Sequence, residues 1–171
     1  GAAFDKGSYY LPTVIEGENF IMAHAEVFDP ERFGYIEQLE EAQENFAAEP
    51  KDVIFVGHTH CPSVFEFDPR SGGIRTLPPV DFALQPGLRY IVNVGSVGDP
   101  RDDNPLSSYC LFDDETGQII FNRLTFDVAA YQADLAARQV PFKPWFLSKA
   151  PGGAISSKTG PPTKPPISGT M

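Results

Sequence analysis

The sequence predicts an α/β fold in which a mixed or antiparallel sheet carries flanking helices. Two observations predict it: short runs of β-branched and aromatic residues recur between turn residues, and two segments show the spacing of amphipathic helices. The 171 residues are 42% hydrophobic and 21% charged, a composition typical of one globular domain.

The first expected elements are a hairpin and a helix. Residues 9–15 and 19–24 are strand-like runs separated by a short turn, which predicts two antiparallel strands. Asp29 is a good helix cap, Pro30 suits the first helical position, and Pro50 ends the pattern. Apolar residues recur at helical spacing between these limits: Tyr35, Ile36, Leu39, Ala42 and Phe46.

Strands and turns then alternate up to a second helix. Residues 53–56 form a continuous apolar run that predicts a buried central strand ending at Gly57. Asp127 caps a helix predicted over residues 128–139. The remaining predicted strands cover residues 64–67, 74–77, 90–94, 108–112 and 118–126.

The chain divides into a folded body, residues 1–147, and a tail. Residues 148–171 contain five Pro, four Gly, four Ser and three Thr, which resist a packed core, so we predict a flexible tail. Within the body, residues 65–86 are rich in turns. We expect them to face substrate or to cover a sheet edge, with plain surface decoration as the alternative.

Charge and hydropathy exclude several classes of function. Thirteen basic and 23 acidic residues give a net charge of −10, so the sequence lacks the basic surface of a nucleic-acid-binding protein. No apolar run approaches the roughly 20 residues that span a bilayer, and the first residues lack the pattern of a signal peptide. We expect no membrane association and a cytoplasmic location, where Cys61 and Cys110 stay reduced. Self-association into a homo-oligomer stays open.

Three histidines are the main candidates for chemistry. His24, His58 and His60 each follow a strand-like run at the point where the chain enters a loop. Because ligands of open α/β sheets bind beyond the carboxyl ends of strands, the three imidazoles are candidates to converge on Zn, Mn or Fe. The alternative for His24 taken alone is a structural histidine that bonds a neighbouring carbonyl.

The loop after residues 90–94 contributes weaker candidates. Ser96 lies among glycines whose backbone N–H groups suit an anion, and the guanidinium of Arg101 suits a phosphate oxygen or an ion pair with a nearby Asp. Asp99, Asp102 and Asp103 are candidates to orient the imidazoles, or they form a solvated acidic loop. No nucleophile elbow, Walker loop or dinucleotide fingerprint occurs, which excludes serine hydrolase chemistry.

Several motifs together resemble those of the calcineurin-like metallophosphoesterases. Residues 52–62, Asp-Val-Ile-Phe-Val-Gly-His-Thr-His-Cys-Pro, resemble the family's last metal motif, Gly-His-x-His, and residues 20–24 resemble the preceding His motif. Residues 90–102 resemble the Asn-x-Gly-Ser-x-Gly-x-Pro-Arg segment of the small prokaryotic branch, and residues 123–141 resemble its closing strand and helix. The resemblance runs in order over residues 9–142.

This resemblance implies a four-layer α/β/β/α sandwich with two divalent metal ions, expected to be Mn, Fe or Zn. A metal-bridging hydroxide would hydrolyse a phosphomonoester, phosphodiester or nucleotide. By motif, His24 and His58 would bind one ion and His60 the other. The implied partners are a phosphorylated small molecule, a nucleotide or a phosphoprotein.

Of the family's early motifs, Asp-x-His and Gly-Asn-His-Asp/Glu do not occur in this sequence, and Gly-Asp occurs only as Gly98-Asp99, within the later segment 90–102 and not ahead of His24. We therefore expect residues 1–147 to be the C-terminal part of a metallophosphoesterase domain, inactive alone, with its catalytic residues unidentified and an apolar sheet face or edge uncovered. Ala25 and Glu26 follow His24 where Gly and a small residue are usual. Two alternatives are a non-catalytic binding or interaction module, and a single zinc held by the three histidines.

Overall fold

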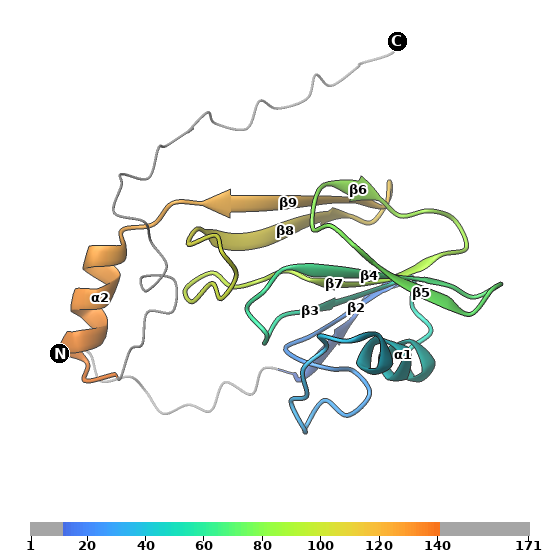
Figure 1. Ribbon diagram of the computed structural model, residues 1–171, viewed down its shortest axis with the longest axis horizontal. Helices are drawn as coiled ribbons and strands as arrows, with labels where there is room; N and C mark the ends of the chain where they lie inside the picture. Colours follow the sequence, from blue (N-terminus) through green and yellow to red (C-terminus); the bar gives the residue numbers. More distant parts are fainter. Residues whose placement is uncertain (1–11, 141–171) are drawn as a thin grey trace, which may run out of the picture.

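The computed structural model describes residues 12–140, which form two stacked β-sheets (Figure 1). The strands of each sheet lie side by side in the following order. The larger contains β1 (Val14–Glu16), β2 (Phe20–Ala23), β3 (Val53–Val56), β7 (Arg89–Asn93), β4 (Ser63–Asp68) and β5 (Gly73–Leu77). The smaller contains β6 (Phe82–Ala83), β9 (Gln118–Leu124) and β8 (Ser107–Asp113). The predicted α/β class with a mixed sheet is confirmed, because β2, β3 and β7 pair in parallel and every other pair is antiparallel.

Two helices accompany the sheets. Helix α1 (Leu39–Ala48) covers the outer face of the larger sheet, whose other face is stacked on the smaller sheet (Figure 1). Helix α2 (Val128–Ala137) lies beyond the end of β9 and has no buried residue. Residues 12–140 thus supply the α, β and β layers of the sandwich. No helix in this range is long and apolar enough to cross a membrane.

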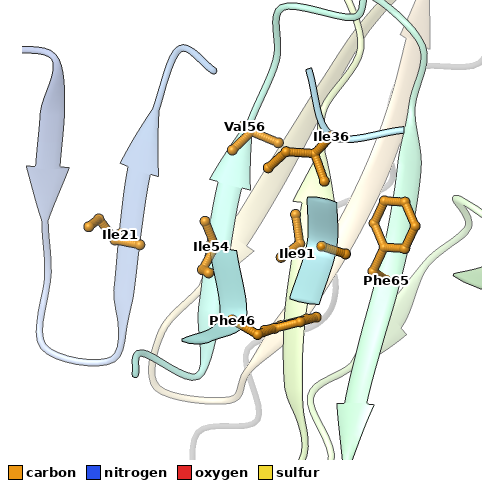
Figure 2. Packing of buried hydrophobic residues seen from close by; sticks show 8 residues of the cluster. Ile21, Ile36, Phe46, Ile54, Val56, Phe65 and Ile91 are labelled. Atoms are coloured by element: carbon orange, nitrogen blue, oxygen red, sulfur yellow. The ribbon is translucent and has the colours of Figure 1, made fainter. Parts of the chain in front are cut away.

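The central strand β3 explains how the core is divided. All four of its residues are buried. Ile54 and Val56 belong to the cluster on the α1 side of the sheet, which also contains Phe46 (Figure 2). Val53 and Phe55 belong to the cluster between the sheets. A strand with helix on one face and sheet on the other must be apolar on both, so its sequence shows a continuous run rather than alternation.

The first helix starts later than the sequence predicts. The prediction placed its cap at Asp29, but α1 begins at Leu39, after Gln38 as N-cap. Gln38 and Glu41 form a capping box, in which the Glu41 carboxylate accepts the Gln38 N–H at 2.9 Å. The residues before it form a loop because the buried Glu26 carboxylate binds Arg32 and the Gly34 N–H, bonds that a helix would break.

Most predicted strands lie within one or two residues of the observed ones. The predicted strands 64–67 and 74–77 correspond to β4 and to the edge strand β5, so residues 65–86, expected to face substrate or to cover a sheet edge, belong largely to the sheet itself. They also include β6, which the prediction missed. The second helix ends at Ala137 rather than residue 139. Part of the first predicted strand, residues 9–11, and the predicted tail, residues 148–171, lie outside the described residues.

One face of the smaller sheet is apolar and exposed. Leu111 of β8 lies opposite Ile120 of β9, and their exposed fractions are 54% and 37%. Leu124 of β9 is 54% exposed. Strand β8 is at the edge of this sheet, where no strand among residues 12–140 pairs with its free side. An uncovered apolar face and edge agree with the expectation from the sequence.

Candidate metal centre

The three histidines lie at one edge of the larger sheet. His24 follows β2, and His58 and His60 follow β3, its parallel neighbour, so the carboxyl ends of both strands meet there. The two strand ends are tied directly, because the Gly57 N–H donates to the carbonyl of His24 at 3.0 Å. Parallel pairing therefore places side chains that are 34 residues apart in the sequence next to each other.

His24 and His58 form a close pair. Nε2 of His24 lies 2.9 Å from Nδ1 of His58, and the ring planes are inclined by 67°. This separation is the length of a hydrogen bond between the two rings. Two imidazole nitrogens bound to one ion at about 2.0–2.1 Å lie about 2.9 Å apart in octahedral geometry and about 3.3 Å apart in tetrahedral geometry. The two nitrogens are therefore close enough to bind one divalent ion after a small shift at most. Burial and the neighbouring His24 and His60 lower the pKa of His58, which favours the neutral ring that metals bind.

His60 is held separately. Its Nδ1 lies 2.7 Å from the backbone oxygen of Asp99 and 3.2 Å from the Asp99 carboxylate. A hydrogen bond from Nδ1–H to these acceptors fixes the tautomer whose Nε2 lone pair can bind a metal. Among residues 12–140 no three His, Cys, Asp or Glu side chains are placed to hold one ion, so the geometry does not support the alternative of a single three-histidine zinc site.

The loop between β3 and β4 holds His58 and His60 in an uncommon backbone conformation. His58 and His60 have φ angles of 63° and 64°, in the left-handed region that costs non-glycine residues energy. Asn93 at the end of β7 stabilises this loop. Its amide donates to the carbonyl of Gly57 at 2.6 Å and to the Thr59 hydroxyl at 2.9 Å. Strain held by buried bonds is typical of functional sites.

Two aromatic rings flank the pair. Tyr35 stacks on His58 with ring centroids 4.6 Å apart and planes inclined by 17°. Phe33 lies 6.1 Å from His24 and 6.3 Å from His58 by ring centroids. Neither ring was predicted as a site residue from the sequence, because helical spacing placed Tyr35 on the face of a helix. The signal available was Gly34 between them, which is unfavourable inside a helix.

A cavity of about 740 Å³ opens between the sheets and reaches the histidines. Its apolar wall is formed by side chains of β2, β3 and β8, including Phe20, Phe55 and Phe112. Its polar end is formed by His24, His58, His60 and Ser96. A concave site with an apolar body and a few convergent polar groups is the usual form of a ligand-binding site.

The match to a known family covers most of this arrangement. Residues 7–117 match the calcineurin-like phosphoesterase superfamily domain, a range that contains all three histidines and every strand of both sheets except β9. The chain belongs to this family.

Similar proteins agree with this assignment. The crystal structure of a metallophosphoesterase from Sphaerobacter thermophilus superposes with a TM-score of 0.68 at 30% identity, covering 77% of this chain and 54% of that one. An uncharacterized protein of Methanocaldococcus jannaschii is 31% identical over 137 residues, 77% of this chain and 53% of that protein. A hypothetical protein from Pyrococcus horikoshii shares the fold, with a TM-score of 0.54 at 14% identity, covering 85% of this chain and 53% of that one. The chain thus spans about half the length of these relatives.

The weaker candidates of the phosphoesterase site lie beside His60. The Ser96 hydroxyl accepts the Asp99 N–H at 3.0 Å, and Nε of Arg101 bonds the Asp99 carboxylate at 3.3 Å. Arg101 thus forms the ion pair that the sequence analysis held as its alternative to phosphate binding. Asp99 is the acid that contacts a histidine, whereas Asp102 pairs with Arg123 instead.

Asn93→Asp should destabilise the histidine loop of this phosphoesterase domain. Asn93 is 1% exposed, and the change replaces its donating amide by an oxygen that faces the Gly57 carbonyl. We expect a loss of about 1–3 kcal/mol in the free energy of unfolding, from urea titration. Asn122→Asp is the matched control, because Asn122 makes a longer, exposed bond of 3.3 Å to Ile120. An equal loss in both variants would contradict this role for Asn93.

The two thiols should be poor nucleophiles. Cys61 and Cys110 are free, and burial raises the pKa of Cys61 and raises that of Cys110 to about 12. At pH 8 a thiol of pKa 12 is ionised in about one molecule in ten thousand. We expect Ellman's reagent to label Cys61 of the folded chain slowly and Cys110 far more slowly. The labelling rate of Cys110 should rise with pH up to about pH 12. Both thiols should react rapidly once the chain is unfolded in guanidinium. Rapid labelling of the folded chain would contradict this.

Proposed function

We propose that the complete protein hydrolyses a phosphoester with two divalent ions of Mn, Fe or Zn. In this proposal His24 and His58 bind one ion and His60 the other. The observation that carries it is the convergence of His24 and His58 at the ends of β2 and β3, with their nitrogens 2.9 Å apart, close enough to share one ion. The family assignment supports metal-dependent phosphoester hydrolysis in general.

The metals would supply the positive charge that activates the attacking water and neutralises the phosphoryl oxygens. The chain's own part is to hold the ligands ready. His58 is kept neutral, its ring lies against Tyr35, and Asp99 presents Nε2 of His60. Such fixed geometry lowers the entropic cost of assembling the reactants.

Substrate contacts are proposed for Ser96 and Arg101. The side chain of Arg101 is 42% exposed beside the His60 loop. The backbone N–H of Arg101 donates to the carbonyl of His60 at 3.2 Å and so holds the residue next to that loop. A guanidinium there offers donors to a phosphate oxygen, as charge-assisted hydrogen bonds require. A phosphorylated small molecule, nucleotide or phosphoprotein suits such a site. The free thiols support a reducing, cytoplasmic location.

Hydrolysis of bis(p-nitrophenyl) phosphate and p-nitrophenyl phosphate tests the proposal. The assay uses a polypeptide that also contains the portion equivalent to the half of the relatives that this chain does not span. This protein is stripped of metal and reloaded with Mn²⁺. We expect turnover with the metal and loss of turnover on stripping and in His58→Ala. Turnover without metal, or full turnover in His58→Ala, would contradict it. Bound metal without hydrolysis would favour the non-catalytic binding module.

A further inference from the structure

The loop between β2 and α1 presents two aromatic side chains beside the histidine pair. Phe33 is 47% exposed and Tyr35 is 45% exposed, although both are large and apolar enough to favour burial. One face of the Tyr35 ring lies on His58, and Phe33 has ring contacts with both His24 and His58. The rings therefore border the place where a ligand of the histidine pair would sit.

The backbone is strained in order to hold Phe33 there. Its φ of 55° lies in the left-handed region, which is a genuine outlier for a bulky residue. Such conformations persist only where the surroundings enforce them, and they cluster at functional sites. A loop with no role for this ring would lose nothing by a Gly or Asn at this position.

A buried carboxylate enforces the conformation. The Glu26 side chain is 2% exposed and accepts two bonds from Arg32, at 2.6 and 2.8 Å, and one from the Gly34 N–H at 3.0 Å. These partners lie on both sides of Phe33 in the sequence. A Cβ on Gly34 would come within 2.2 Å of the Glu26 carboxylate, so the loop needs glycine there. The hydrogen bonds of the Glu26 carboxylate therefore fix the loop that carries the two rings before any ligand binds.

Exposed and preorganised aromatic rings favour a flat ligand group. Nucleobases stack on such rings at about 1–3 kcal/mol per base, which corresponds to roughly 5- to 150-fold in affinity. An aliphatic phosphoester gains nothing comparable. We propose that Phe33 and Tyr35 form a stacking platform for a planar aromatic group of the substrate, the base of a nucleotide, while its phosphate is held at the histidines. This inference rests on the proposed function for the position of the phosphate.

The test compares adenosine 5′-monophosphate with ribose 5-phosphate, which carries the same phosphate and sugar without the base. Affinities for the Zn²⁺-loaded full chain are measured by calorimetry. We expect the adenosine compound to bind about tenfold more tightly in the wild type. Phe33→Asn and Tyr35→Leu should remove most of this preference, which is measured as the ratio of the two affinities within each variant, so that any change in phosphate binding affects both compounds equally.

Two controls keep the result interpretable. Asparagine tolerates the left-handed conformation, so Phe33→Asn removes the ring without new backbone strain. Phe28→Leu is the matched control, because Phe28 is 50% exposed in the same loop but packs over Arg32, and its preference should stay at the wild-type value. Zn²⁺ affinity and urea unfolding of each variant report whether the histidine pair and the fold are intact.

Equal affinities of the wild type for the two compounds, or binding of neither, would overturn the inference. So would a Phe33→Asn variant that keeps the full preference. Base-selective binding without hydrolysis of any phosphoester would leave the platform standing and contradict the catalytic proposal. Metal-dependent hydrolysis without base selectivity would overturn the stacking platform and support the catalytic proposal.

Discussion

Replacing His58 by alanine is expected to weaken binding of Mn²⁺ or Zn²⁺ by about a hundredfold or more. Loss of residues that merely orient a ligand costs about 10- to 100-fold in metal affinity, and His58 is proposed as a ligand itself. With Nδ1 of His58 gone, Nε2 of His24 loses the nitrogen that lies 2.9 Å away. Calorimetric titration of the metal-free chain, with metal content by mass spectrometry, measures the loss.

His60→Ala is the matched control, because it removes an imidazole from the same loop but not from the pair. We expect His24→Ala and His58→Ala to lose the same ion, and His60→Ala to keep it. Unchanged metal affinity in His58→Ala would contradict the assignment of the pair. Loss of a single common ion in all three variants would instead indicate one shared site, against the geometry of the described residues.

Ile54→Ala is expected to cost about 2–5 kcal/mol in the free energy of unfolding. Ile54 is 0% exposed in the central strand β3, between Ile21 of β2 and Ile91 of β7, with Phe46 of α1 across the same face (Figure 2). The surrounding strands are hydrogen-bonded on both sides and cannot close the cavity that the change leaves. Urea titration followed by circular dichroism measures the difference.

Ile15→Ala makes the same chemical change on the edge strand β1, where Ile15 is 48% exposed. Its cost should lie within about 0.5 kcal/mol, as for most surface substitutions. A similar cost in both variants would mean that the core is not centred on β3. Because His58 follows β3, a large loss of stability in Ile54→Ala should also weaken metal binding by that variant.

The sequence predicted the features that depend on local pattern. A run as apolar as Val53–Val56 has few options other than a buried strand, and Gly57 with two histidines after it marks that strand's end. Turn-rich links predicted the β4–β5 hairpin, and Asp127 predicted the start of α2. The motif order over most of the body indicated the family before any contact was known.

Local pattern misled where a distant partner decided the conformation. Residues 29–38 have helical spacing, yet the buried Glu26 carboxylate takes Arg32 and the Gly34 N–H and keeps them out of a helix. A buried charge must be paired, and this requirement outweighs the weak helical preference of ten residues. The platform of Phe33 and Tyr35 exists only because of this contact.

The sequence by itself determined the fold class, the family and the three histidines as candidates, because strand length, turn residues and motif spacing are local properties. The family resemblance implied that His24 and His58 act together, but only the tertiary structure shows their contact and its cause. The contact depends on the parallel register of β2 against β3, which brings His24 to His58, and the loop after β7 brings Asp99 to His60. Register is set by packing of whole strands against α1 and the second sheet, and no short stretch of sequence contains it.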